Sequence, residues 1–176
     1  MRIDDILYFA PEIPFNAVDF NSPQMPVQFQ SRIEGFYLAP ARRCVDAGFA
    51  FAAGSLAVVC IDALARFQVG GKVGPRFKAF VRRELRSFAS ETKARQLYDE
   101  FRNGLIHEAR IKRGAQFSLD ADATITEIGG VLLVNPARLT EEVTEALGNY
   151  VDRLVRDSAE RRRLARLLVA DHADDV

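Results

Sequence analysis

The sequence has little cysteine and little histidine. Each residue type occurs twice, at Cys44 and Cys60 and at His107 and His172, so no Cys/His cluster has the spacing of a zinc site. Both cysteines fall in one predicted helix, where 16 residues of rise separate them by roughly 24 Å, too far for a disulfide. We therefore expect no disulfide, no metal and no cofactor, and a reducing compartment.

Neither the pattern of a signal peptide at residues 1–14 nor a run of apolar residues as long as a bilayer crossing is found in the sequence. Residues 1–14 carry acidic residues and prolines where a signal peptide has a basic start and an apolar core. The uncharged run at residues 47–61 is 15 residues long, short of the ~20 that a membrane helix needs. We expect a cytoplasmic protein without a membrane partner, in which this run forms the buried central helix.

An excess of charge of either sign is absent as well. The chain carries 24 basic and 24 acidic residues, which excludes a uniformly basic nucleic-acid coat. Residues 42–113, however, hold 15 basic and 7 acidic groups between two acidic flanks, and this asymmetry favours an anionic partner. All but four of the basic residues are arginine, which suits phosphate contacts, although a GC-rich genome would also enrich arginine.

The composition indicates a single soluble domain. The chain has 176 residues, of which 48% are hydrophobic, enough for one core. Prolines and the absence of periodicity predict an irregular N-terminal arm at residues 1–26. Residues 27–170 are predicted to form one helical domain, and residues 171–176 a frayed tail.

Hydrophobic spacing predicts most of this domain to be helical. The first helix is expected to start at Val27 and to stop near Leu38, because Pro40 disfavours helical geometry before it. Further helices are predicted at residues 42–67, 75–88 and 91–110, and from Pro136 onward, with residues 161–169 extending the last one or forming a separate helix.

Strand-forming residues interrupt the helical pattern once. Segments 116–119, 124–128 and 131–134 are rich in strand formers, and Gly129-Gly130 separates the last two as a hairpin turn would. The predicted fold class is therefore an all-α helical bundle of four to five main helices, with a small β-hairpin insertion at about residues 116–134, between the helix at 91–110 and the C-terminal helix.

One helix carries a constellation that suggests chemistry. At about 100° per residue, Leu97, Phe101 and Leu105 share a core face. The opposite side carries one apolar residue among three polar ones: Arg102, Asn103, Ile106 and His107. A solvated face more often shows lysine and glutamate pairs, so we interpret this side as a surface covered by a second chain, with Ile106 at the dimer interface.

The string R-N-x-x-x-H formed by Arg102, Asn103 and His107 resembles the signature of HEPN domains, small all-α proteins with an R-x(4–6)-H motif. The similarity extends over residues 27–157, in the order of a long apolar helix, an arginine-bearing helix, the motif helix and a terminal helix introduced by Val-Asn-Pro. It implies a homodimer whose two motif helices form one composite site, and metal-independent endoribonuclease activity. Other HEPN proteins are inactive or act as partners in toxin–antitoxin and anti-phage systems.

The resemblance implies a role for each motif residue. His107 would transfer a proton at the 2′-hydroxyl or the leaving oxygen, Arg102 would stabilise charge on the phosphate, and Asn103 would orient either group. Alternatives without catalysis exist for two of them. His107 would interact favourably with the dipole of its helix C-terminus, and Arg102 would pair with a nearby acid, Asp99 or Glu91.

A second basic surface is predicted on the preceding helix. We expect its cations, together with one after the motif, to contact RNA phosphates: Arg76, Lys78, Arg82, Arg83, Arg86 and Arg110. The alternative is an ordinary solvated face.

The sequence supports two functions. One is a dimeric HEPN-type ribonuclease, acting as a toxin or anti-phage effector with a cognate antitoxin or defence-system protein. The other is a non-catalytic dimeric module that binds nucleotide, RNA or a partner protein.

Overall fold

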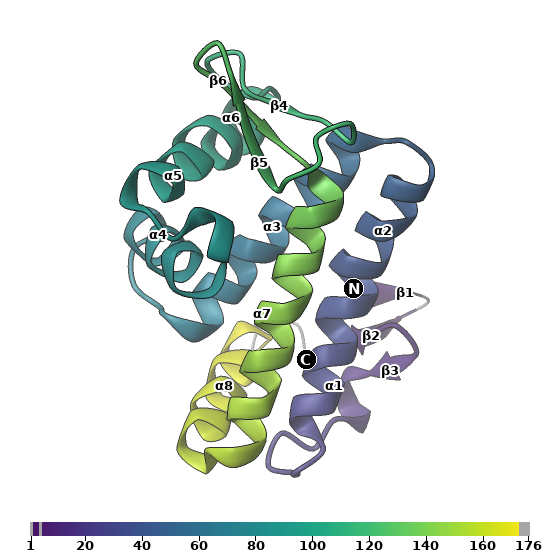
Figure 1. Ribbon diagram of the computed structural model, residues 1–176. Helices are drawn as coiled ribbons and strands as arrows, with labels where there is room; N and C mark the ends of the chain where they lie inside the picture. The colour runs from purple at the N-terminus through teal and green to yellow at the C-terminus, as the bar shows by residue number, and fades with distance from the viewer. Residues whose placement is uncertain (1, 4, 173–176) are drawn as a thin grey trace. The chain divides into compact units, whose positions relative to one another are not determined.

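The computed structural model describes residues 2–3 and 5–172, and it is mostly helical with two small three-stranded sheets (Figure 1). This confirms the helical class. The chain divides into two compact units, one of Tyr37–Ala146 and one of Met1–Phe36 with Leu147–Val176. The predicted tail at residues 171–176 lies, from residue 173 on, outside the described residues.

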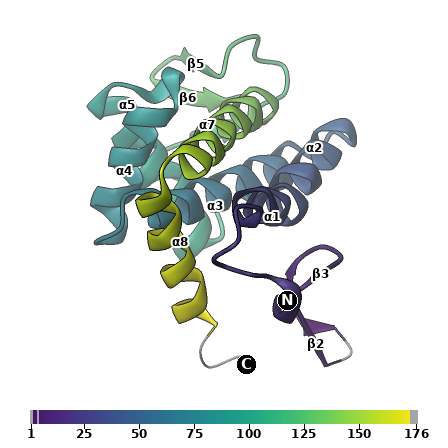
Figure 2. The same ribbon diagram turned by 90° about the horizontal axis from the view of Figure 1, so that it is seen from below.

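The unit of residues 37–146 is built around one apolar helix. Helix α3 lies between α2 and α4 in both ribbon views (Figures 1 and 2). The helical elements of this unit follow each other as α2 (Ala39–Asp46), α3 (Ala50–Gln68), α4 (Val73–Glu84), a 3-10 turn (Arg86–Phe88), α5 (Glu91–Gln96), a π-helical segment (Leu97–Arg102) and α6 (Asn103–Glu108). Helix α7 (Pro136–Arg156) begins in this unit.

Helix α3 is the buried central helix that the uncharged run predicts. Ala57, Ile61 and Leu64 are fully buried on it. By length and composition alone α3 is also apolar enough to cross a membrane, yet half of its most apolar window is buried among the described residues. Core helices of soluble proteins pass the same test of length and composition.

Three predicted helix boundaries are wrong. The helix expected at residues 75–88 ends at Glu84, because Leu85 is extended and a separate 3-10 turn follows it. The helix expected at residues 42–67 breaks between Asp46 and Ala50, where Gly48 adopts a φ of 77° that glycine tolerates. Cys44 and Cys60 consequently lie in different helices, as free thiols. The stop expected before Pro40 does not occur either, because a π-helical segment (Glu34–Leu38) leads into α2, and Pro40 occupies its first turn, where a missing N–H is tolerated.

The predicted β appendage is confirmed. Strands β5 (Ile125–Ile128) and β6 (Val131–Val134) form an antiparallel hairpin whose two turn glycines both have positive φ. Strand β4 (Gln116–Phe117) pairs in parallel with β6 on its other side, which gives the order β4-β6-β5.

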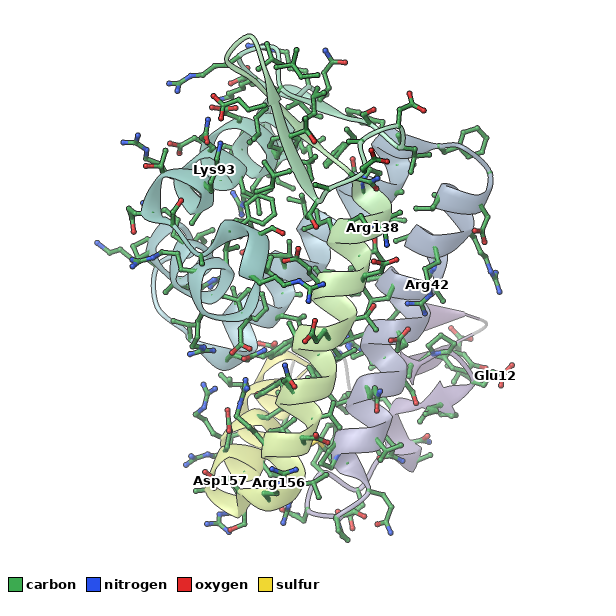
Figure 3. The ribbon with its side chains drawn as sticks, viewed as in Figure 1. Glu12, Arg42, Lys93, Arg138, Arg156 and Asp157 are labelled. Carbon is green, nitrogen blue, oxygen red and sulfur yellow. The ribbon has the colours of Figure 1, made fainter. Side chains whose placement is uncertain are left out.

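The appendage packs against the motif helix. The ring centroid of Phe117 lies 5.0 Å from that of Phe101 and 6.4 Å from that of Phe51. A Cβ on Gly54 would lie 2.4 Å from the Phe117 ring, so the absence of a side chain there admits the ring. Lys93, labelled on α5 in Figure 3, forms a 2.7 Å ion pair with Glu127 of β5.

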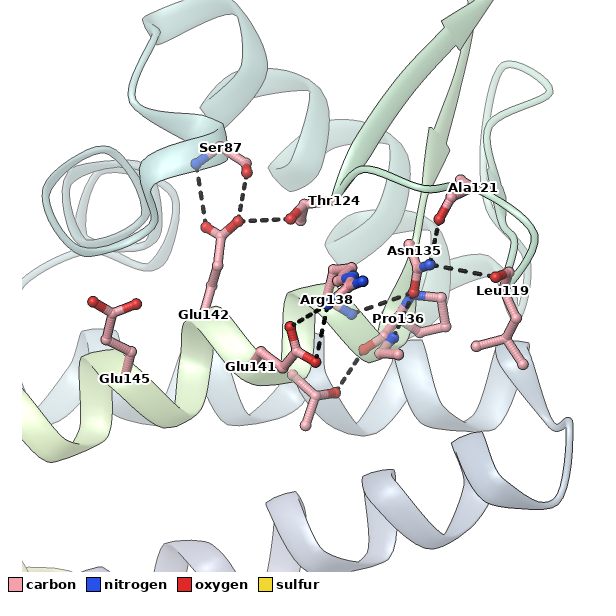
Figure 4. A network of polar contacts seen from close by, with 12 residues as sticks. Ser87, Leu119, Ala121, Thr124, Asn135, Pro136, Arg138, Glu141, Glu142 and Glu145 are labelled. Carbon is pink, nitrogen blue, oxygen red and sulfur yellow. Dashed lines mark hydrogen bonds and ion pairs between the residues drawn. The ribbon is translucent and has the colours of Figure 1, made fainter.

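A buried polar network joins the appendage to the start of α7 (Figure 4). The Asn135 side chain caps α7 by accepting from Ala137 N at 2.9 Å and donates to the Ala121 carbonyl at 2.6 Å. Glu142, only 3% exposed, accepts from the backbone and hydroxyl of Ser87 and from the Thr124 hydroxyl. The expected Val-Asn-Pro start of this helix is thus a capped helix N-terminus.

The other unit contains α1 (Met25–Ile33), the end of α7, α8 (Ser158–Asp171) and a sheet that the sequence did not predict. The arm was predicted to be irregular, but β1 (Arg2–Ile3), β2 (Ile6–Ala10) and β3 (Ile13–Pro14) form an antiparallel meander (Figure 1). Strands of two to five residues are too short to show a periodic pattern. Asp157 caps α8, so residues 161–169 belong to a separate terminal helix.

Aromatic packing forms the core of this second unit. The ring of Phe29 meets that of Tyr150 edge-on at 5.9 Å, and Phe9 is fully buried. Burial raises the pKa of the Tyr150 hydroxyl. His172, to which the sequence assigned no role, is 8% exposed and stacks on Phe15 at 4.6 Å, with its Nδ1 2.8 Å from the Leu168 carbonyl oxygen.

Candidate functional site

The motif helix contains a π-helical segment. Ser90 caps its start by accepting from Lys93 N at 3.2 Å, and helical structure then continues from Glu91 to Glu108. The π-helical segment Leu97–Arg102 inserts one extra residue into a turn and so rotates the residues after it by about 100°. Gly104 is therefore buried while Leu105, which regular helical spacing placed in the core, is only half-buried.

Arg102 is held by an acid from another helix. Its Nε and Nη2 donate to Oδ2 of Asp62 on α3, at 3.1 and 2.7 Å, and its Nη1 donates to Asn103 Oδ1 at 3.3 Å. The Arg102 side chain is 13% exposed. The alternative that Arg102 forms an ion pair with an acid is confirmed, but the acid is Asp62. The expected partners, Asp99 and Glu91, are wrong, and Glu91 pairs with Arg82 instead.

The structure brings Arg102 and Asn103 together and leaves His107 apart. Within the described part of the chain, no hydrogen bond joins His107 to either of them. His107 is exposed near the C-terminus of α6, and Ile106 beside it is 52% exposed. The predicted non-core position is thus correct for Ile106 and His107, which are exposed. Arg102 and Asn103, at the start of the motif, are partly buried.

The chain turns back immediately after the motif. Ala109 adopts a left-handed φ of 53°, and the backbone of Lys112 donates to the Glu100 carbonyl at 2.9 Å. A Cβ on Gly104 would lie 2.3 Å from the Arg110 carbonyl oxygen. The absence of a side chain at this glycine therefore admits the returning backbone of its own chain.

Two carboxyl groups flank the motif with opposite pKa shifts. Burial raises the pKa of Glu100, whose side chain is 7% exposed and whose cation, Arg113, lies 3.9 Å away. Lys112, through a hydrogen bond and its charge, lowers the pKa of Glu108, and Arg110 adds to this at 2.6 Å. Arg110, predicted to contact phosphate, is therefore paired with Glu108.

The predicted basic face of α4 divides into two groups. Three arginines of the predicted face pair with residues outside the motif: Arg82 with Glu91 at the start of α5, Arg83 with Glu84 and Gln68, and Arg86, in the 3-10 turn after α4, with Glu145. Arg76 and Lys78 lie instead beside Asp62 and Tyr98. Arg76 Nη2 is 3.5 Å from Asp62 Oδ1, and Lys78 Nζ lies 5.9 Å from the centre of the Tyr98 ring.

Asp62 and Tyr98 were not predicted to belong to the site. Asp62 interrupts a long apolar run, and a lone acid on a buried helix is a signal for a cationic partner, although sequence cannot name that partner. Tyr98 lies one residue after Leu97 of the predicted core face. It is half-buried, and the guanidinium of Arg102 lies 5.8 Å from its ring centre.

Surface hollows lie elsewhere in the molecule. One of about 590 Å³ is lined by α2 and α7, and one of about 580 Å³ by α8 and Phe20 with Asn21. Neither is lined by the three motif residues. No group of three or more His, Cys, Asp or Glu side chains arranged to hold a metal ion occurs within residues 2–3 and 5–172.

The chain matches no protein-family model, no curated protein and no solved structure. The HEPN resemblance therefore remains a prediction that depends on the R-N-x-x-x-H string and the order of the helices.

Proposed function

We propose that the protein is a metal-independent endoribonuclease of HEPN type, active as a homodimer whose two motif helices face each other. The observation that carries the proposal is the arrangement on one helix: an anchored Arg102–Asn103 pair, followed one turn later by an exposed histidine beside an exposed isoleucine. An apolar side chain that is 52% exposed among polar groups suits a face that a second copy covers.

The residues divide the chemistry between them. Exposed His107 is free to approach a 2′-hydroxyl, and a histidine transfers protons near neutral pH. Arg102 uses Nε and Nη2 on Asp62, and each terminal nitrogen retains a further N–H for a phosphate oxygen. Because no hydrogen bond joins His107 to Arg102 within the described part of one chain, the partner chain would supply the histidine that meets this arginine.

The test is cleavage of single-stranded RNA by the purified protein in the presence of EDTA. We expect cleavage by the wild type and a loss of at least about 100-fold with His107→Ala, the usual size of an acid–base contribution. Arg95→Ala, an exposed arginine on the same helical run, is the matched control and should cleave normally. Intact RNA with the wild type, or equal cleavage by His107→Ala, would contradict the proposal.

A second function is favoured by one observation. The Arg102 fork is directed at Asp62, as in a purely structural ion pair between α3 and the motif helix. In that case the protein is a non-catalytic dimeric module and the motif face binds a second copy. His107→Ala and Ile106→Ser would then both weaken dimerisation in analytical ultracentrifugation, whereas the catalytic function predicts that His107→Ala leaves the dimer intact.

A further inference from the structure

Two arginines share a single carboxylate beside the motif. Asp62 Oδ2 accepts from Arg102 at 2.7 Å, and Asp62 Oδ1 is 3.5 Å from Arg76 Nη2. The three side chains are only 13–19% exposed. One negative charge therefore faces two positive charges in a setting that is largely removed from water, and charge left unpaired there is costly.

A third cation lies on the same aromatic ring. Lys78 Nζ and the Arg102 guanidinium lie 5.9 and 5.8 Å from the centre of the Tyr98 ring. A Cβ on Gly74 would be 3.1 Å from the Tyr98 hydroxyl, so the first turn of α4 closely approaches this ring. Helices α3 and α4 and the motif helix thus contribute to one cluster: Asp62, Arg76, Lys78, Tyr98 and Arg102.

The arginine farther from the motif is incompletely bonded. Arg76 Nη1 donates to the Gly71 carbonyl at 3.3 Å, while Nε, although buried, donates no hydrogen bond among the described residues. By contrast, Arg82 on the same helix has its own carboxylate at 2.7 Å. The cation excess on α4 is therefore concentrated at the end that meets the motif.

We propose that this cluster is a phosphate-binding site, in which Arg76 and Arg102 hold oxygens of one phosphate group and Lys78 supplies additional positive charge. Guanidinium groups bind phosphate oxygens through paired hydrogen bonds, and a phosphate would balance the excess positive charge. The Tyr98 ring packs against Phe77 at 5.5 Å and against two cations, so it is a platform for the cations rather than for a base. The proposal that the cluster binds a phosphate of RNA rests on the proposed ribonuclease function. The proposal that the cluster binds phosphate does not.

The experiment measures binding of pyrophosphate and of a short 2′-O-methyl RNA, which resists cleavage, by calorimetry at constant ionic strength. We expect Arg76→Ala to weaken binding about tenfold, the loss of one charge-assisted phosphate contact. Lys78→Ala should weaken it about threefold, as expected for a more solvated charge. Arg82→Ala is the matched control on the same helix and should bind like the wild type.

Each outcome decides the proposal. Binding of either probe that depends on Arg76 and not on Arg82 supports it, and the probe bound tells RNA from a small phosphate ligand. Absence of binding, or equal loss with Arg76→Ala and Arg82→Ala, overturns it. If Arg76→Ala does not fold, Arg76→Lys keeps the charge without the fork and should still lose about threefold.

The two proposals fail separately. Arg76-dependent phosphate binding without RNA cleavage would leave the phosphate site standing and contradict the ribonuclease. RNA cleavage that needs His107, together with phosphate binding that does not change in Arg76→Ala, would support the ribonuclease and contradict the phosphate site.

Discussion

Two carboxylates inside the unit of residues 37–146 join distant segments in different ways. Glu142 is 3% exposed and accepts, among the described residues, from neutral donors: the backbone and hydroxyl of Ser87 and the Thr124 hydroxyl. Asp62 is 19% exposed and accepts from guanidinium groups of Arg102 and Arg76. Both link elements far apart in sequence, but only Asp62 is surrounded by more positive charge than it balances.

The difference separates a structural connection from a site that can take a ligand. Three neutral donors occupy lone pairs of Glu142, and no ion pair to this carboxylate occurs among the described residues. Two arginines on Asp62 leave positive charge and N–H groups available. Replacing each acid therefore tests whether the groups around it carry unbalanced positive charge that an added anion could neutralise.

The largest expected effect comes from Glu142→Ala. It leaves the donors of Ser87 and Thr124 buried and disconnects the appendage and the 3-10 turn from α7, so the free energy of unfolding should fall by about 3 kcal/mol. Urea denaturation measures this. Glu141→Ala, an exposed neighbour paired with Arg138, is the control and should cost less than about 0.5 kcal/mol.

A smaller loss, about 1.5 kcal/mol, is expected for Asp62→Ala, because it leaves two cations together in a partly solvated place. This loss should shrink at high sodium chloride, where repulsion between the arginines is screened. The loss for Glu142→Ala should not respond to salt, since its donors are neutral. An equal salt response of the two variants would contradict the comparison.

Glu100 provides a test by pH in the motif helix itself. Because burial raises its pKa in the folded state, the folded protein binds this proton more tightly than the unfolded chain. The stability that Glu100 contributes is therefore greatest below its ordinary value of 4.5 and is lost as the pH rises through the raised pKa. Glu100→Gln should be more stable than the wild type at neutral pH, with the gain declining toward pH 4.5 in thermal melts.

The smallest effect on stability is expected for His107→Ala. His107 is exposed, so the change should alter the free energy of unfolding by less than about 0.5 kcal/mol while removing RNA cleavage. Urea denaturation beside the cleavage assay measures both. A large loss of stability would mean that His107 holds the fold, as Glu142 does, and would remove the reason for giving it a chemical role.

Much of the secondary structure was predictable because it depends on local signals. Ser90 before the motif helix, the glycines after Gln68 and Gly129-Gly130 between two apolar strands each specify a cap, a stop or a turn within a few residues. The break at Gly48 was missed because the apolar pattern continues across it. The short strands of the N-terminal arm were missed because they carry no pattern at all.

The candidate site was predictable only in part. The sequence by itself determined that Arg102, Asn103 and His107 share one helix and that basic residues gather before and within it. Only the tertiary structure decided that Arg102 is held by Asp62, that Arg76 joins it, and that Arg82, Arg83 and Arg86 pair with other side chains. The reason is physical: helical spacing fixes neighbours within one helix, whereas ion-pair partners 40 residues apart are chosen by how the helices pack.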